Sequence, residues 1–266
     1  MTQAAVSYQI KLLEERVGAS LFLRGPRGVT LSEAGQRLVP AVTSAFSQLR
    51  AAFEELNETE AGVLSITVLP TFANNWLVPR LGAFTLAHPD IAVRVDMNSA
   101  LVDFARADID VGIRSGRGKW PGLVAHGLFA AAFTPMLSPL LLARAGPLSE
   151  PADLLKLPLI DPEDSDWSDW FVAAGVPAPD LSRRTEMRVQ SQHLAGRAAL
   201  AGQGAAILMP AFFAEELADG RLVQPFPLVR QASEVHYWLV YAEARRRSTR
   251  IRAFRDWILG ETARKG

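Results

Sequence analysis

Short polar side chains recur at helical spacing at the start of the chain. Thr2, Gln3 and Ser7 are followed by Tyr8 and Lys11. A glutamine side chain can pair with an adenine edge, a hydroxyl group adapts to either base, and a lysine meets a phosphate. Together on one helix face, such groups are compatible with a helix that reads the DNA major groove. From spacing alone, an ordinary surface helix with a polar face is the favoured interpretation, and the residues that follow shift it towards a DNA-reading helix.

The other face of the same segment is apolar. Its residues step by four, three and four positions, namely Val6, Ile10, Leu13 and Val17. This spacing is typical of one stripe of an amphipathic helix. Thr2 suits the N-cap because its hydroxyl can accept from the first turn, and Gly18 suits the C-cap.

The segment that follows predicts a tight hairpin. Pro26 and Gly28 supply the turn, and Arg24 and Arg27 stand at its tip. Arginines in this position can reach a phosphate or a narrow minor groove. Ser32 then suits the cap of a further helix.

This stretch resembles a known DNA-binding family. The run TQAAVSYQIKLLEERVGASLFLRGPRGVTLSEAGQRL is similar to the second half of the winged helix-turn-helix of LysR-type transcriptional regulators, and the similarity continues through the chain. Among the subgroups, the chain is most similar to the glycine-cleavage and beta-lactamase regulators. The resemblance implies a double-stranded operator with an interrupted palindrome. It also implies the residues that meet this DNA: Thr2, Gln3, Ala4, Ser7, Tyr8 and Lys11 on the helix, and Arg24 and Arg27 on the wing.

The resemblance starts partway through the family's DNA-binding domain. Relatives carry two further helices before this point, and these brace the recognition helix. A sequence that begins late and a natural fragment that senses ligand without DNA are both compatible with this. We expect the chain in this form to bind DNA weakly or not at all, and we expect upstream sequence to restore binding.

Composition excludes several classes of protein. The chain has 266 residues, 49% of them hydrophobic, with a net charge of +0 and no cysteine. That content supports folded cores and excludes wholesale disorder. No apolar run approaches the roughly 20 residues that span a bilayer, and no signal peptide is evident. Because disulfides are impossible, the cytoplasm is the expected compartment, and we expect no membrane partner.

The DNA-binding segment is expected at residues 1–31. Residues 32–61 are predicted to form the linker helix that follows it. Its apolar positions step by four or three: Leu38, Val42, Phe46, Leu49, Phe53 and Leu56. So narrow a seam suits a coiled coil, although Pro40 should loosen its early turns. A helix packed on its own domain is the alternative. The resemblance implies a dimerisation helix and assembly of the chain into dimers and tetramers.

Residues 62–266 alternate between strand and helix patterns. This alternation predicts parallel sheets with right-handed crossovers. The resemblance implies an α/β, two-lobed, periplasmic-binding-protein-like (type 2) effector domain. We expect lobe I at about 62–134 and 240–266 and lobe II at about 135–239, with the chain crossing near 133–137 and 237–240. The expected elements are strands at 63–69, 91–96, 109–114, 204–209 and 237–241, and helices at 70–88, 101–107, 167–175, 192–203 and 249–259.

The effector site is expected between the lobes, because ligands of open sheets bind beyond the carboxyl ends of strands. Thr71 and Phe72 follow the first strand and begin a helix, whose N–H groups favour an anion. The resemblance implies that this segment and a later helix start contact a small-molecule effector. Capping and lobe packing are the alternative roles. The candidates are Thr71, Phe72, Arg114, Ser115, Trp120, Gln190, Ser191, Gln192, Tyr237 and Trp238.

Enzymatic readings have little support in the sequence. The four histidines lack metal-ligand spacing, no nucleophile elbow occurs, and the loop at 116–122 lacks the Walker pattern. The acidic stretch at 161–169 is interpreted as a solvated loop and helix start. We therefore expect no enzyme, metal site or cofactor. A DNA-binding regulator with an effector domain is the favoured function, and the alternative is a solute-binding or regulatory fragment without DNA binding.

Overall fold

The computed structural model describes residues 2–25, 28–57, 62–100, 104 and 109–264. It divides into two compact units, Met1–Glu58 and Thr59–Gly266. The first unit contains a helix, a hairpin and a long helix, which are α1 (Gln3–Val17), β1 (Phe22–Gly25), β2 (Gly28–Leu31) and α2 (Glu33–Asn57).

Hydrogen bonds between side chains and the backbone stabilise the ends of the elements in the first unit. The Thr2 hydroxyl accepts from the backbone of the first turn of α1, and Gly18 ends this helix in the left-handed conformation, as expected. The Glu14 carboxylate accepts from the backbone N–H groups of Leu21 and Phe22 at 2.7 and 3.1 Å. This carboxylate therefore ties α1 to the start of the hairpin.

The start of α2 is packed closely against the hairpin. Ser32 Oγ accepts from the Gly35 N–H at 3.0 Å and donates to the Ser20 carbonyl at 2.5 Å. A Cβ at Gly35 would collide with the Leu21 carbonyl oxygen. Glycine at this position thus allows the first turn of α2 to approach the backbone that precedes β1.

The second unit is built on one seven-stranded sheet with the order β4-β3-β5-β9-β6-β8-β7. In lobe I, β3 pairs in parallel with both β4 and β5, as the alternating pattern predicts. In lobe II, β7 pairs in parallel with β8. The strands are β3 (Gly62–Val68), β4 (Ile91–Met97), β5 (Val111–Gly116), β6 (Leu123–Met136), β7 (Leu159–Ile160), β8 (Ala205–Leu208) and β9 (Arg230–Ala242).

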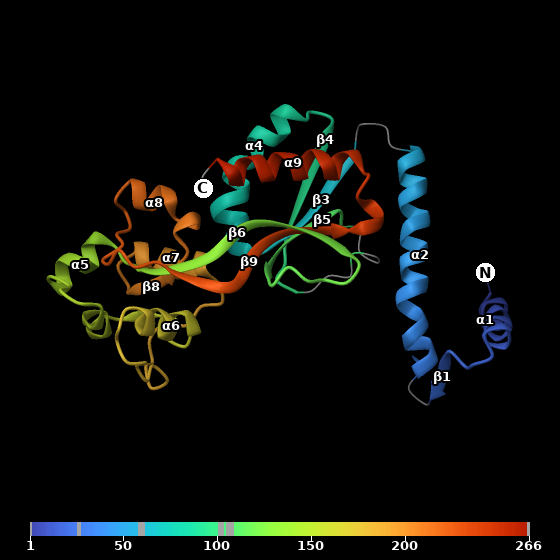
Figure 1. The fold of residues 1–266 in the computed structure, drawn as a ribbon, viewed down its shortest axis with the longest axis horizontal. Helices are drawn as coiled ribbons and strands as arrows, with labels where there is room; N and C mark the ends of the chain where they lie inside the picture. The colour runs from blue at the N-terminus through green and yellow to red at the C-terminus, as the bar shows by residue number, and fades with distance from the viewer. Residues whose placement is uncertain (1, 26–27, 58–61, 101–103, 105–108, 265–266) are drawn as a thin grey trace. The chain divides into compact units, whose positions relative to one another are not determined.

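Helices cover both lobes, with lobe II and its helices at one end of the long strands (Figure 1). The expected helix at 101–107 lies almost wholly outside the described residues. Those of lobe I are α3 (Pro70–Phe72), η1 (Ala73–Leu77), α4 (Val78–Ala87), η4 (Glu243–Arg245) and α9 (Thr249–Ala263). Those of lobe II are α5 (Pro139–Ala145), η2 (Pro151–Lys156), α6 (Ser165–Ala173), α7 (Gln192–Leu200), η3 (Pro210–Phe212) and α8 (Ala214–Ala218).

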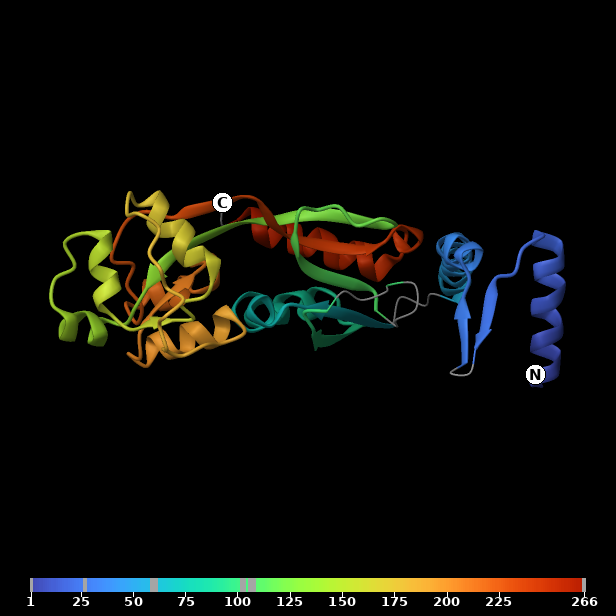
Figure 2. The same ribbon diagram turned by 90° about the horizontal axis from the view of Figure 1, so that it is seen from below.

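Two long antiparallel strands, β6 and β9, run side by side from one lobe to the other (Figures 1 and 2). Their register shifts twice, between Gly127 and Phe129 and between Ala130 and Ala132. The expected crossing at 237–240 needs correction, because Tyr237 pairs with Ser115 and Val240 with Gly112, both in β5 of lobe I. This run is paired with a strand of lobe I, so β9 crosses earlier along the chain.

The helix after β3 contains a wide turn. Residues Ala73–Leu77 form a π-helical segment between α3 and α4, closed by the Val78 N–H donating to the Ala73 carbonyl. Pro79 has no N–H to bond the carbonyl four residues earlier, which favours a local departure from the α-helical pattern. The turn contains both Asn75 and Trp76.

One core cluster extends through both lobes, and a charged group anchors its edge. In α9, Ile251, Phe254 and Ile258 are buried, and Phe254 packs edge-to-face on Phe84 of α4. The Asp110 carboxylate, with its side chain 4% exposed, binds Arg245 at 2.9 Å and Arg250 at 3.1 Å. It also accepts from the Ser65 N–H at 2.8 Å, and so joins β3, η4 and α9.

Candidate functional site

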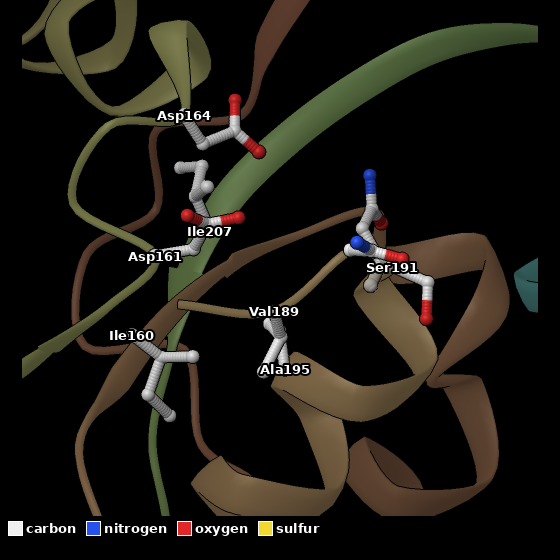
Figure 3. Close-up of a pocket in the computed structure, with 9 residues that line it drawn as sticks. Ile160, Asp161, Asp164, Val189, Ser191, Ala195 and Ile207 are labelled. Carbon is white, nitrogen blue, oxygen red and sulfur yellow. The ribbon is translucent and has the colours of Figure 1, made fainter. Parts of the chain in front are cut away.

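A cavity of about 310 Å³ opens in lobe II where β7 ends and α7 begins. Figure 3 shows Asp161 and Asp164 on one side of it and Ser191 on the other. Carboxyl ends of parallel strands and the adjoining helix start are the usual place for a ligand in an α/β sheet. The cavity is lined by Ile160, Asp161, Asp164, Val189, Gln190, Ser191, Gln192, Ala195 and Ile207.

A tight turn after β7 forms the acidic wall. Asp161 has φ of 53°, and among the described residues it alone has a positive φ without being glycine. Aspartate tolerates this left-handed conformation better than most residues. The Asp161 N–H donates to the Met187 carbonyl at 2.7 Å, which holds the turn in place.

The electrostatics of this wall favour a positive or hydrogen-bond-donating group. Burial raises the pKa of Asp161, and the neighbouring Asp164 and Glu163 raise it further, against an opposing effect of Arg188. Burial also raises the pKa of Asp164, while the Asp166 N–H lowers it. Among the described lining residues, no lysine, arginine or histidine balances the two carboxyl groups.

The opposite wall is the first turn of α7. Ser191 caps the helix, because its hydroxyl accepts from the Leu194 N–H at 3.4 Å. Gln192 Oε1 accepts from the Met209 N–H at 3.0 Å, which links the turn to the end of β8. The sequence-predicted residues Gln190, Ser191 and Gln192 therefore come together in one cavity.

Thr71, Phe72 and Tyr237 lie at the contact between the lobes. Thr71 Oγ1 accepts from the His193 N–H at 3.2 Å, one residue beyond the cavity-lining Gln192. The rings of Phe72 and Tyr237 pack in an aromatic cluster with Phe212 of lobe II. Burial and the Asp166 carboxylate raise the pKa of Tyr237 to about 12, so its hydroxyl stays protonated near neutrality.

Arg114 and Ser115 stand at the end of β5, away from the cavity lining. The Arg114 guanidinium is buried and donates to Thr67 Oγ1 at 2.8 Å and to the Thr67 carbonyl at 3.2 Å. Burial lowers its pKa, while Asp96 raises it. Ser115 is exposed. The Arg114 side chain is therefore bound inside lobe I. A contact of Arg114 or Ser115 with the effector stays a prediction.

Trp120 and Trp238 pack on each other, with ring centroids 6.4 Å apart. The Trp238 indole N–H donates to the Gly116 carbonyl at 2.8 Å. Both side chains join a small apolar cluster around Phe104 and Val240. They form part of the packing beneath the loop at 116–122, and a role in covering an effector stays a prediction.

The candidate DNA-reading residues lie along α1. Gln3, Tyr8 and Lys11 are exposed, as are Thr2 and Ala4, while Ser7 is half-buried. Lys11 Nζ lies 3.8 Å from the Glu15 carboxylate, an exposed pair that a phosphate can displace at little cost. Arg24 is exposed on β1, and Arg27 lies outside the described residues.

No group of residues in the described part of the chain could hold a metal ion. Among those same residues, no helix is both long and apolar enough to cross a bilayer.

Two protein families match the chain, each over a different part of it. The LysR substrate binding domain matches residues 57–263. The bacterial regulatory helix-turn-helix protein of the lysR family matches residues 1–36. A reading helix with a wing, followed by a two-lobed α/β domain, defines an effector-controlled DNA-binding regulator. The chain belongs to the LysR family of transcriptional regulators.

Relatives and solved structures agree with this assignment. The glycine cleavage system transcriptional activator of Escherichia coli K12 is 38% identical over 265 residues, covering 99% of this chain and 86% of the relative. The HTH-type transcriptional activator AmpR of Citrobacter koseri is 36% identical over 261 residues, covering 97% and 88%. The effector domain of AmpR from Pseudomonas aeruginosa has a TM-score of 0.66 at 34% identity, covering 77% of this chain and 97% of that one.

Sequence reasoning missed the two aspartates of the cavity. The acidic stretch was interpreted as a loop and helix start, and Asp164 does cap α6 through the Asp166 N–H at 2.9 Å. Asp161 also directly follows the buried strand β7, where site residues of α/β sheets are found. That position in the chain was the signal that could have identified it.

Proposed function

We propose that this LysR-type regulator binds its effector in the lobe II cavity, between Asp161 and Asp164 on one side and the first turn of α7 on the other. The observation that carries the proposal is a cavity of about 310 Å³ at the end of β7, lined by polar groups of two elements. This volume suits a small metabolite, because it lies at the lower end of the range for ligand pockets.

The charge of the cavity narrows the class of effector. Its charged lining residues in the described chain are both carboxylic. An ammonium or amine group would receive charge-assisted hydrogen bonds there, whereas a dianion would meet repulsion. Ser191 and the amides of Gln190 and Gln192 offer further hydrogen bonds. We infer an amine-bearing effector of modest size.

In the proposed function, α1 and the wing bind the DNA. Gln3, Ser7 and Tyr8 face the bases, together with Thr2 and Ala4, and Lys11 meets the phosphates. Arg24 and Arg27 hold the DNA backbone. What supports this is the exposure of the polar face and its similarity to the family's reading helix.

Assembly connects the two functions. Dimers form through α2, pair into tetramers through the effector domains and bind an interrupted palindrome. An effector in the cavity changes lobe closure and hence the spacing of the DNA-reading helices, since a ligand shifts a conformational equilibrium only by binding one state better.

A thermal-shift screen tests the effector class. Amino acids, other amines, purines and muropeptide fragments are compared with dicarboxylates of similar size. We expect amine-bearing compounds to raise the melting temperature of the chain and not that of Asp161→Asn. Stabilisation by dicarboxylates alone would contradict the inferred class.

A gel shift first establishes that the protein used binds an operator fragment, and footprinting then tests the switch. A compound that stabilises the protein is expected to alter the protected length or the bending of an operator fragment. An unchanged footprint at saturating compound would refute the coupling between the cavity and the reading helices.

A further inference from the structure

The first turn of α7 meets both the effector cavity and lobe I. Ser191, Gln192 and Ala195 line the cavity on one side. On another side, His193 and Arg197 line a smaller cavity of about 130 Å³, whose wall includes Asn75 of lobe I. A single helical turn therefore contacts the proposed effector and the other lobe at once.

Two hydrogen bonds at His193 join this turn to the helix that follows β3. The His193 backbone N–H donates to Thr71 Oγ1 at 3.2 Å. The ring Nδ1 lies 2.7 Å from Asn75 Oδ1. Because an amide oxygen only accepts, this hydrogen bond forms in the tautomer whose Nδ1 carries the proton and donates. Both acceptors belong to lobe I, and both bonds begin at one residue of lobe II.

The hydrogen bonds at His193, rather than the apolar packing around them, make the contact between the lobes specific. Next to Asn75, the Trp76 ring packs against Phe72 and Phe129 in the aromatic cluster between the lobes. Apolar packing of this kind holds the lobes together without direction. The hydrogen bonds at His193 add direction, since they are satisfied only when α7 stands at one register against Thr71 and Asn75.

We propose that His193 is a positioning residue, which holds the first turn of α7 in place through Asn75 and so links the shape of the effector cavity to the contact between the lobes. This inference rests on the proposed function, which assigns that cavity to the effector. An effector that moves Ser191 or Gln192 displaces His193 with them, because all three belong to the same turn.

A cysteine reporter tests the proposal without any effector. The chain has no cysteine, so Ala195→Cys introduces a single thiol, at a cavity-lining position that is 6% exposed. Its rate of alkylation by iodoacetamide measures how often the first turn of α7 opens. A second reporter, Ala131→Cys in β6 at 1% exposure, measures general unfolding in a separate protein.

We expect His193→Ala to speed labelling at position 195 by roughly five-fold, the change in an opening equilibrium that loss of one ordinary hydrogen bond produces. Asn75→Ala should act similarly, and the double variant should add little, because both changes remove the same bond. His193→Asn places an amide nitrogen near the position of Nδ1 and should restore slow labelling.

Leu194→Ala is the matched control, since Leu194 lies on the same turn and is 50% exposed. Equal acceleration by this variant, failure of His193→Asn to restore protection, or equal acceleration at position 131 would overturn the proposal. The labelling result is independent of the thermal-shift screen. If labelling follows the prediction and no amine binds, the effector assignment fails while the positioning role of His193 stands.

Discussion

The backbone N–H of Asp164 donates to the carbonyl oxygen of Asp161 at 3.0 Å. This bond closes the turn after β7 and brings both carboxyl groups to one wall of the cavity (Figure 3). Neither carboxyl group was identified as part of a site from the sequence, yet together they set the charge of the proposed effector pocket.

Replacing Asp161 with asparagine should weaken an amine-bearing effector by roughly ten-fold or more, because hydrogen bonds to charged groups contribute about 1.5–3 kcal/mol. Isothermal titration calorimetry with an amine from the screen measures the change. Glu163→Gln is the control, since Glu163 is two residues further along the chain, is not part of the cavity lining, and pairs with Arg188 at 2.7 Å. Because the pKa of Asp161 is raised, affinity for a cation should also fall as the pH is lowered through that pKa. Equal loss in both variants would argue against a direct contact.

Asp166 should make the stability of the protein depend on pH. Burial, with Asp164 and Asp169, raises its pKa from 3.8 to about 6, against the opposing effect of Arg230. The folded chain therefore binds this proton more tightly than the unfolded chain, so stability falls as the pH rises from about 4 to 6.

The pH effect can be measured as a difference between two proteins. Relative to Asp166→Asn, the free energy of unfolding of the wild type should decline by up to about 1.4 kcal/mol per pH unit in that window and stay level above it. Urea titrations at several pH values give this difference. A difference that does not vary with pH would disprove the raised pKa. Asp169→Asn is the comparison, because Asp169 also binds Arg230, at 2.6 Å.

Loss of the Asp110 carboxylate should be among the most destabilising single changes. Asp110→Ala removes the shared partner of Arg245 and Arg250 and an acceptor for the Ser65 N–H. Breaking a buried ion pair costs about 3–5 kcal/mol, and we expect about 3 kcal/mol by chemical denaturation. Asp256→Ala in α9 removes an ion pair whose carboxylate is exposed and whose partner, Arg255, is half-buried, and should cost under about 1 kcal/mol. Comparable losses would contradict the anchoring role.

A charge on the seam of α2 should dissociate the oligomer. Phe46 is 69% exposed and Leu49 is 53% exposed, so an apolar stripe of α2 is uncovered in the single chain. Phe46→Glu is expected to weaken dimerisation by roughly 100-fold, since it places a charge at the core of a helical seam. Analytical ultracentrifugation over a range of concentrations measures this. Gln48→Glu adds the same charge on a different face, and dissociation by both variants would reject the seam as the interface.

The fold was largely predictable because its signals are local. Apolar periodicity and turn residues located α1, the hairpin, α2 and the parallel strands β3, β4 and β5. The hydrogen-bond partners of long side chains were not predictable, because these partners lie far away in the sequence. Arg114 stands at the end of a strand as expected, yet its guanidinium turns to Thr67, a contact 47 residues distant. Trp238 likewise lies in an expected strand, but its indole N–H donates to the Gly116 carbonyl, 122 residues distant.

The candidate site was predictable only in part, for the same reason. The helix start at Gln190, Ser191 and Gln192 was visible as a polar run before an apolar pattern. Asp161 reaches the wall of the cavity through a turn with positive φ and through the arrangement of β7 beside β8, neither of which is encoded in residue type alone.

The π-helical turn at Ala73–Leu77 sets the phase between Thr71 and the later residues of this helix that face lobe II. A π turn holds one more residue than an α turn, so the residues after it are rotated by about 100° relative to a regular helix. Thr71 precedes the extra residue, whereas Asn75 and Trp76 lie within the widened turn. Shortening the turn by one residue would therefore leave Thr71 in phase with His193 while turning Asn75 or Trp76 aside. In this helix the number of residues, as much as their identity, determines whether the two lobes fit together.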